Sequence, residues 1–214
     1  MIKYLGNIIE SGILKNISKD DSVEAFKELS ITARKYEAGT AVIYEDAKID
    51  KICIVAKGFV HGEKLYAQGD LHIIQRYEEN SIFALESAVS RLKTVPMDYI
   101  CGEDSDIVFI SINSIKKSTY YHEIMDVLVQ ELADDNIRKM HKIELLAEKS
   151  LRGRIMLYLG LLQKKSGSDQ FHVNMNREQL AQFLCVNRSA LSNELSKMKQ
   201  EGIIDFKKDQ FRML

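Results

Sequence analysis

The chain has 214 residues, 45% of them hydrophobic and 29% charged, and its formal net charge at pH 7 is −1. This length provides for one or two domains with buried cores, and the composition is that of a soluble globular protein. No apolar run reaches the ~18 residues that a membrane span needs, and the N-terminus lacks the apolar segment of a signal peptide. We therefore expect a cytoplasmic protein without a membrane partner.

Charge is unevenly distributed along the sequence. Residues 1–143 hold 18 Lys and Arg against 23 Asp and Glu, whereas residues 144–214 hold 12 against 8. An acidic part followed by a basic part is typical of a sensor or partner module joined to a nucleic-acid-binding module.

The first part of the chain changes character near residue 31. Apolar side chains at helical spacing predict helices over residues 1–30, with Ser22 at the start of the second one. Residues 31–112 are instead short β-rich runs separated by glycines, which predict an antiparallel barrel or jelly roll of the cupin-like kind. A short helical insertion is expected over Ile82–Val89. The predicted strands are Ile31–Tyr36, Ala41–Tyr44, Lys51–Ala56, Phe59–Tyr66, Leu71–Tyr77, Pro96–Cys101 and Ile107–Ile112.

Residues 114–149 contain neither Gly nor Pro and are predicted to form one long helix. Its apolar stripe is longer than a small barrel could cover, so we expect a parallel helix pair between two subunits. Asn136 falls near the seam, where a polar pair could set the register. The alternative is a long helix packed only on its own domain. The stripe consists of Tyr121, Ile124, Leu128, Leu132, Met140, Ile143 and Leu146.

Two short helices joined by a tight turn are predicted near the C-terminus. Asn176 is a good helix N-cap, and Gln179 stands three residues later, at the spacing of a capping box. The turn Cys185-Val186 precedes a second helix, which Asn187 is expected to cap. Upstream of this pair, the predicted elements are a helix over residues 150–166 and a strand over Phe171–Val173.

The second of these helices has two distinct faces. Leu191, Leu195 and Met198 form one apolar stripe. The opposite face is polar and almost free of acids, so its N-terminal turn could enter the major groove of DNA, as in a helix-turn-helix. The residues on or near that face are Arg188, Ser189, Ser192, Asn193, Ser196 and Lys199.

A short hairpin with a basic turn at Lys207-Lys208 is predicted after Gly202. A hairpin directly after a recognition helix is typical of the wing of a winged helix. The alternative is an ordinary helical hairpin followed by a surface strand pair. The caps, the polar outer face and the basic turn together favour DNA binding.

The order of barrel, long helix and winged helix-turn-helix resembles the Crp/Fnr family of bacterial transcription regulators across nearly the whole chain. The similarity is most specific in residues 176–204, NREQLAQFLCVNRSALSNELSKMKQEGII, where members have a similar cap, a short turn and an arginine that opens the recognition helix. Gly39 and Gly58 fit the family's turn glycines, and Glu103-Asp104-Ser105 fits its turn before the last barrel strand. The resemblance implies an α+β fold with a sensor barrel over 1–113, a dimerisation helix over 114–143 and a DNA-binding domain over 144–214.

The resemblance also implies which residues read DNA. Arg188 would hold a guanine edge, and the next exposed positions would contact neighbouring bases. Ser189 stands where many members carry Glu, and Asn193 stands where many carry Arg. These departures bear on the preferred DNA sequence and not on DNA binding itself. The expected DNA-binding residues are Asn187, Arg188, Ser189, Ser192, Asn193, Lys197, Lys207 and Lys208.

The expected effector site departs from the cyclic-nucleotide cassette of the family. Members that bind cyclic nucleotides have Phe-Gly-Glu followed further on by Arg-Ser, whereas this chain has Phe83-Ala84-Leu85 and Val95-Pro96. A cyclic phosphate would lose a charge-assisted bidentate contact here, and Pro96 has no backbone N–H to donate. We therefore expect an effector other than cAMP; a fully packed barrel is the alternative. The expected pocket residues are Phe83, Leu85, Glu86, Pro96, Ile124 and Leu128.

No cofactor is expected. Cys53, Cys101 and Cys185 are scattered, and the five histidines show no paired spacing, so the sequence predicts no zinc, iron–sulfur or haem site. It also lacks a nucleophile–base set and a phosphate-binding loop, which argues against an enzyme.

The sequence thus predicts a homodimeric, sequence-specific regulator of transcription that binds a near-palindromic operator in double-stranded DNA, with RNA polymerase as a further partner implied by the resemblance. An unknown small-molecule effector would shift the dimer between DNA-competent and incompetent states. One alternative is a regulator that is controlled only by its own abundance. Another is a cyclic-nucleotide-binding signalling protein whose C-terminal module contacts protein instead of DNA.

Overall fold

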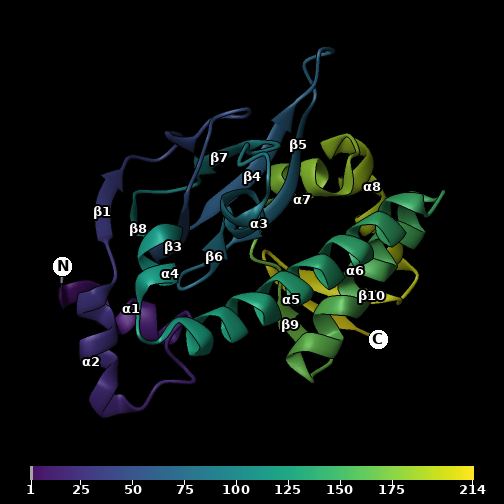
Figure 1. Cartoon of the computed structure of the whole chain (residues 1–214). Coiled ribbons are helices and arrows are strands. Elements are labelled where there is room, and N and C mark those ends of the chain that lie inside the picture. Colours follow the sequence, from purple (N-terminus) through teal and green to yellow (C-terminus); the bar gives the residue numbers. More distant parts are fainter. Residues whose placement is uncertain (1) are drawn as a thin grey trace. The chain divides into compact units, whose positions relative to one another are not determined.

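The computed structural model describes residues 2–214 (Figure 1). The chain divides into two compact units, residues 2–65 with 74–136 and residues 66–73 with 137–214. The long helix α5 (Tyr121–Ala147) contributes its first part to the first unit and its remainder to the second. Among the described residues, no helix is both long and apolar enough to cross a membrane.

Two antiparallel sheets form the body of the first unit, as predicted (Figure 1). One sheet has the strand order β1-β8-β3-β6, and the other has the order β2-β7-β4-β5. The expected insertion contributes both the short strand β6 and the helix α3 (Leu85–Val89). The strands are β1 Ile31–Tyr36, β2 Ala41–Ile43, β3 Lys51–Lys57, β4 Val60–Leu65, β5 Leu71–Tyr77, β6 Ile82–Phe83, β7 Asp98–Cys101 and β8 Ser105–Ser111.

Alternation along the strands gives the first unit two separate cores. Successive residues of a strand point to opposite faces of the sheet. On β8, Ile107 packs with Tyr99 between the two sheets, whereas Val108 packs with Ile8 beneath the N-terminal helices. All four of these side chains are fully buried.

The N-terminal helices are a 3-10 turn (Ile2–Tyr4), α1 (Leu5–Glu10) and α2 (Lys19–Glu28). The prediction that Ser22 starts the second helix is wrong. The Oγ of Ser18 accepts a hydrogen bond from the backbone N–H of Asp21 at 3.1 Å, so Ser18 is the N-cap. Ser22 lies buried within the helix.

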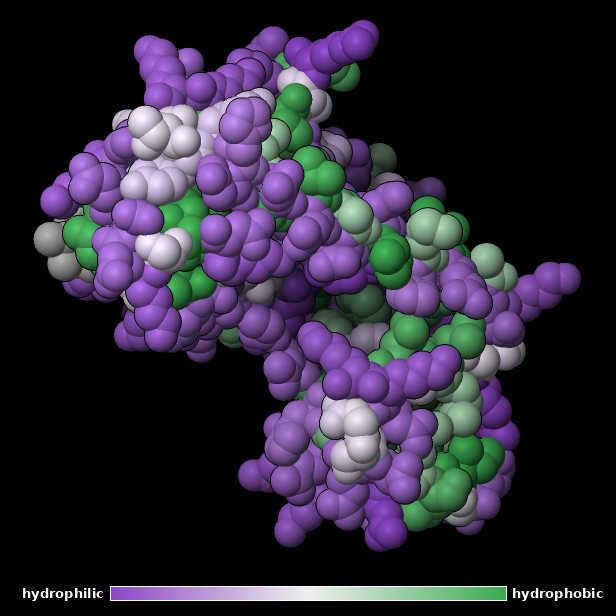
Figure 2. Space-filling view, turned by 60° about the horizontal axis from the view of Figure 1, so that its bottom comes forward, coloured by the Kyte–Doolittle hydropathy of each residue, from purple (hydrophilic) through white to green (hydrophobic). Residues whose placement is uncertain are grey.

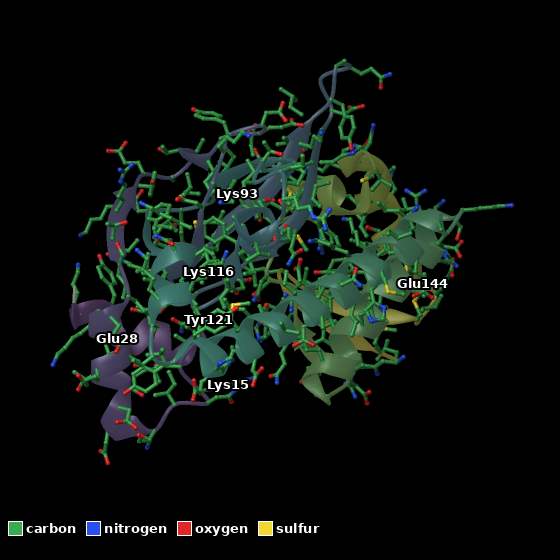
Figure 3. The ribbon with its side chains drawn as sticks, viewed as in Figure 1. Lys15, Glu28, Lys93, Lys116, Tyr121 and Glu144 are labelled. Atoms are coloured by element: carbon green, nitrogen blue, oxygen red, sulfur yellow. The ribbon has the colours of Figure 1, made fainter. Side chains whose placement is uncertain are left out.

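The predicted single helix over 114–149 is instead two helices, α4 (Ile112–Lys117) and α5. The carboxylate of Glu28, at the end of α2, binds the residues at the break (Glu28 is labelled in Figure 3). It accepts hydrogen bonds from the Ser118 hydroxyl at 2.7 Å and from the backbone N–H and hydroxyl of Thr119, both at 2.8 Å. These bonds satisfy polar groups between the two helices, including a backbone N–H that a continuous helix would pair with a backbone carbonyl.

The apolar stripe of α5 also divides into two parts. Ile124 and Leu128 are buried in the core that contains the N-terminal helices, so the prediction that the whole stripe lacks an intrachain partner is wrong for this half. Further along the helix, Met140 is 60% exposed and Ile143 is 69% exposed. Hydrophobic residues also reach the surface in patches on the largely hydrophilic face shown in Figure 2.

The second unit consists of helices around one core and a small antiparallel sheet with the strand order β10-β11-β9. Ile155 and Leu159 of α6 and Leu191 and Leu195 of α8 meet in this core. The predicted helix pair and hairpin are confirmed. The elements are α6 Leu151–Ser166, β9 Gln170–His172, α7 Arg177–Leu184, α8 Arg188–Gln200, β10 Ile204–Lys207 and β11 Gln210–Met213.

Candidate nucleic-acid interface

The first helix of the pair, α7, begins with the predicted capping box. The side-chain oxygen of Asn176 accepts a hydrogen bond from the backbone N–H of Gln179 at 2.9 Å, and the Gln179 side chain accepts one from the backbone N–H of Asn176 at 3.0 Å. Two N–H groups at the helix start are thereby satisfied, which fixes where α7 begins.

A tight turn ends α7 and leads into α8. Cys185 has a left-handed backbone with φ of 54°. The N–H of Val186 donates to the carbonyl of Ala181 at 3.0 Å, and the N–H of Cys185 donates to that of Gln182 at 3.3 Å. This is the hydrogen-bond pattern of a Schellman motif, formed here without the usual glycine.

Helix α8 has the two faces that its sequence predicted. Leu191, Leu195 and Met198 are 1% exposed or less, so they anchor the helix in the core of the second unit. Of the predicted DNA-binding side chains on or beside α8, only Ser192 is half-buried. The exposed ones are Asn187, Arg188, Ser189, Asn193 and Lys197.

The prediction that the Asn187 side chain caps α8 is wrong. Asn187 occupies the N-cap position, but its side-chain oxygen accepts a hydrogen bond from the Ser189 hydroxyl at 3.1 Å and none from the helix backbone. The first turn of α8 therefore has N–H groups without a side-chain cap. The start of a helix with such groups, and with the positive end of the helix dipole, favours a phosphate.

Negative charge on α8 is neutralised from the side away from the polar face. Arg152 of α6 donates to Glu194 at 2.6 Å and to the two carboxylate oxygens of Glu201 at 2.6 and 3.0 Å. Hydrogen bonds from Arg152 lower the pKa of Glu201. Because Glu194 is the only acidic residue within Arg188–Gln200, the polar face of α8 remains free of uncompensated acids.

The basic residues of this region differ in their availability. Arg188 lies 3.8 Å from Glu178, and both side chains are more than half exposed, so this contact is weak. Lys199 forms a 2.6 Å ion pair with Asp205 and donates to the carbonyl of Phe206 at 3.0 Å. Lys199 therefore supports the hairpin, whereas Arg188 and Lys197 extend into solvent.

The hairpin of β10 and β11 presents the predicted basic turn. Lys207 and Lys208 are exposed, and Lys208 has a left-handed backbone with φ of 57°. The next residue, Asp209, lies 3.0 Å from Nδ1 of His172, and this hydrogen bond lowers the pKa of Asp209. The bond ties the turn of the hairpin to β9.

Three further arginines of the second unit were missed by sequence reasoning. Arg177 lies over the rings of Phe206 and Phe211, at 4.8 and 5.1 Å from their centroids, and burial lowers its pKa. Arg212 is exposed on β11 and adds to the basic surface of the hairpin. For Arg152 and Arg177 the partners are distant in sequence, so no local pattern could have revealed their roles. The position of Arg212 in the predicted hairpin could have done so.

The predicted effector residues occupy different surroundings in the first unit. Leu85, Ile124 and Leu128 belong to the core beneath the N-terminal helices, whereas Phe83 belongs to the core between the sheets. Pro96 is exposed.

Two tyrosines beside Phe83 were also missed. The ring centroids of Tyr77, Tyr99 and Phe83 lie 5.1 to 5.9 Å from one another. Both hydroxyl groups are buried, and neither has a hydrogen-bond partner among the residues that the structure describes. Burial raises the pKa of both hydroxyls, and the nearby Glu86 raises it further. Both occupy inward-facing positions of predicted strands, and the alternation of residues along those strands was the sequence signal that could have identified them.

The second unit matches a known domain family. Residues 153–214 match the family model of the Crp-like helix-turn-helix domain. No curated protein matches the sequence.

Solved structures with a similar fold span almost the whole chain. FixK2 from Bradyrhizobium japonicum has a TM-score of 0.70 and 18% identity, over 86% of this chain and 93% of that one. The c-di-GMP-responsive global regulator CLP of Xanthomonas campestris has a TM-score of 0.71 and 15% identity, over 89% and 97%. A CooA mutant from Carboxydothermus hydrogenoformans has a TM-score of 0.73 and 17% identity, over 89% and 85%. The chain therefore carries a Crp-like helix-turn-helix domain at its C-terminus, on the fold of a Crp/Fnr-type transcription regulator.

Proposed function

We propose that the protein is a cytoplasmic, homodimeric regulator of transcription that binds a near-palindromic operator in double-stranded DNA. The observation that carries this proposal is the outer face of α8. Its side chains are polar, its single acid is held by Arg152, and its first turn lacks a side-chain cap. Such a face can approach the phosphates and base edges of the major groove without electrostatic cost.

Different residues of the interface have different tasks in this proposal. Arg188 opens α8, where its guanidinium can reach the acceptors of a guanine edge. Ser189, Ser192 and Asn193 lie within the next one and a half turns and contact neighbouring bases. The exposed lysines contact phosphates and so add affinity for any sequence. These are Lys197, Lys207 and Lys208.

The exposed side of α5 supports the dimer. Six of its exposed residues follow the alternating three- and four-residue spacing of a coiled-coil seam, and five of them are apolar. Asn136 is the polar member, as expected of a residue that sets register. In this proposal residues 1–113 form the sensor domain, 114–143 the dimerisation helix and 144–214 the DNA-binding domain. The seam consists of Val129, Ala133, Asn136, Met140, Ile143 and Ala147.

An effector site is proposed in the first unit, beside Phe83 and Glu86. The buried hydroxyls of Tyr77 and Tyr99 support it, because an unpartnered buried polar group costs free energy that a bound ligand could recover. Val95 is buried and Pro96 is exposed where a cyclic phosphate would need Arg and Ser, so the effector proposed is not cAMP.

Selection of bound duplexes from a random pool tests the proposed function. We expect an enriched operator with two inverted half-sites whose centres lie about one helical turn apart, roughly 34–36 Å. Binding should weaken steeply as salt increases, because phosphate contacts release counterions. Recovery of no sequence, together with salt-independent retention of DNA, would instead favour a signalling protein whose C-terminal domain contacts protein.

A further inference from the structure

A cavity of about 390 Å³ opens in the first unit between β1, β2 and the loop that follows β2. Its volume falls in the range of small-molecule sites, roughly 300–1,000 Å³. None of Tyr77, Tyr99, Phe83 or Glu86 lines it, so it is distinct from the effector site proposed above. Its walls come from β1, β2, β3, β8 and residues 44–50.

Positive charge predominates in the lining of this cavity. Arg34 of β1, Lys48 of the loop and Lys51 of β3 line it together with one acid, Asp50. Within the described residues, none of the three cations forms an ion pair. The cavity thus has three basic residues and one acidic residue, whereas residues 1–143 as a whole have 18 basic and 23 acidic residues.

Aromatic rings supply much of the remaining lining. Tyr36, Tyr44 and Phe109 contribute them, and Tyr44 is 68% exposed. Thr32 pairs with Phe109 across β1 and β8, so Arg34, two residues after Thr32, lies on the same face of the sheet as Phe109. Burial raises the pKa of Tyr36, and the guanidinium of Arg34, which interacts with its hydroxyl, opposes that rise.

The loop at the rim is held in place by backbone hydrogen bonds. The N–H of Asp46 donates to the carbonyl of Val95 at 2.9 Å, and the N–H of Val95 donates to that of Ala47 at 3.1 Å. The N–H of Ile49 donates to the carbonyl of Lys93 at 2.8 Å (Lys93 is labelled in Figure 3). A ligand would therefore meet Lys48 on an ordered loop, which reduces the entropy lost on binding.

We propose that this cavity is a binding site for a small organic anion with a planar apolar body, such as an aromatic carboxylate. The carboxylate would be held by Arg34, Lys48 and Lys51, and its ring would pack on the aromatic side chains. Arg34 can present two parallel N–H groups to a carboxylate. A cation would be repelled by the same residues. The proposal concerns ligand binding alone, so its outcome does not depend on whether the second unit binds DNA.

Titration of the full-length chain with salicylate, followed by amide NMR, tests the proposal. Salicylate is an aromatic carboxylate, and 2-hydroxybenzyl alcohol is its neutral counterpart. We expect saturable shifts confined to residues 32–51 and the neighbouring part of β8, with the alcohol binding at least tenfold more weakly. Higher salt should weaken salicylate binding, because the ion contacts are partly exposed to solvent.

The double variant Arg34→Met/Lys51→Met retains the apolar stems and removes two charges. It should bind salicylate at least tenfold more weakly than the wild type does. Lys57→Met is the matched control, because Lys57 ends the same strand but does not line the cavity, and its affinity should be unchanged. Equal binding of acid and alcohol, shifts spread over the surface, no saturable binding, or wild-type affinity in the folded double variant would each overturn the proposal. The comparison of acid with alcohol on the wild type stands even if the double variant does not fold.

Discussion

Lys142 of α5 should make the stability of the second unit depend on pH above neutrality. Its ammonium nitrogen contacts the carbonyl oxygen of Phe183 near the end of α7, and it lies 3.3 Å from the carbonyl oxygen of Ile73. It also lies 3.2 Å from the centroid of the Phe183 ring. Burial lowers the pKa of Lys142 from 10.5 to about 7. The change to test is Lys142→Met, which retains the apolar stem.

The sign and size of the effect follow from proton linkage. Between pH 7 and pH 10.5 the unfolded chain binds a proton at Lys142 that the folded chain does not bind. The free energy of unfolding therefore rises with pH across this window, by about 1.4 kcal/mol per pH unit at its steepest, and this contribution is constant below pH 7. Over the whole window the change amounts to about 4–5 kcal/mol.

Urea denaturation at pH 7, 8 and 9 measures this effect. The difference between wild type and Lys142→Met should change by about 1 kcal/mol or more per pH unit, because cysteines and tyrosines that also titrate cancel in the difference. Lys149→Met, at an exposed lysine two residues beyond α5, is the control and should run parallel to the wild type. A constant difference between wild type and Lys142→Met at all three pH values would refute the reasoning.

Other substitutions test the turns, the dimer seam and the buried tyrosines. Gly58→Ala should lower the unfolding free energy by about 2–4 kcal/mol, since φ is +82° and the new Cβ would lie 2.4 Å from Ser105 Oγ. Gly39→Ala, with φ of +79° and open space around the new Cβ, should lower it by only about 1 kcal/mol. Thermal melts would compare the two variants. Met140→Lys with Ile143→Lys should give folded monomers in sedimentation, because both side chains are exposed within one chain; an unchanged dimer would contradict the seam. Tyr77→Phe should leave stability unchanged or raise it by about 1 kcal/mol in urea denaturation, since its hydroxyl has no hydrogen-bond partner within residues 2–214; a loss of 2 kcal/mol or more would mean that the hydroxyl has one.

Local signals predicted the second unit well. Asn176 and Gln179 are three residues apart and form the capping box without help from elsewhere. The stripe that ends at Met198 required only helical periodicity. The antiparallel strands likewise followed from alternation and turn residues, which act over a few positions.

Contacts between distant residues account for what the sequence did not reveal. The break before α5 depends on Glu28, which lies 90 residues before Ser118. The burial of Leu128 depends on the N-terminal helices, and the neutralisation of Glu194 depends on Arg152, 42 residues earlier. The cap predicted at Asn187 failed because a side chain two residues away competed for it. Such outcomes are decided by packing, which periodicity does not specify.

The affinity of wild type and Arg188→Ala for the selected operator, compared with a scrambled duplex of the same length, tests the central claim most directly. We predict that the wild type prefers the operator and that Arg188→Ala loses about 1–3 kcal/mol of specific binding, with relaxed preference at one base pair per half-site. Lys207→Ala should weaken both duplexes alike, and Arg91→Ala, at an exposed arginine of the first unit, should change neither affinity. Equal affinity of the wild type for both duplexes, or an Arg188→Ala protein with unchanged affinity and preference, would contradict the account.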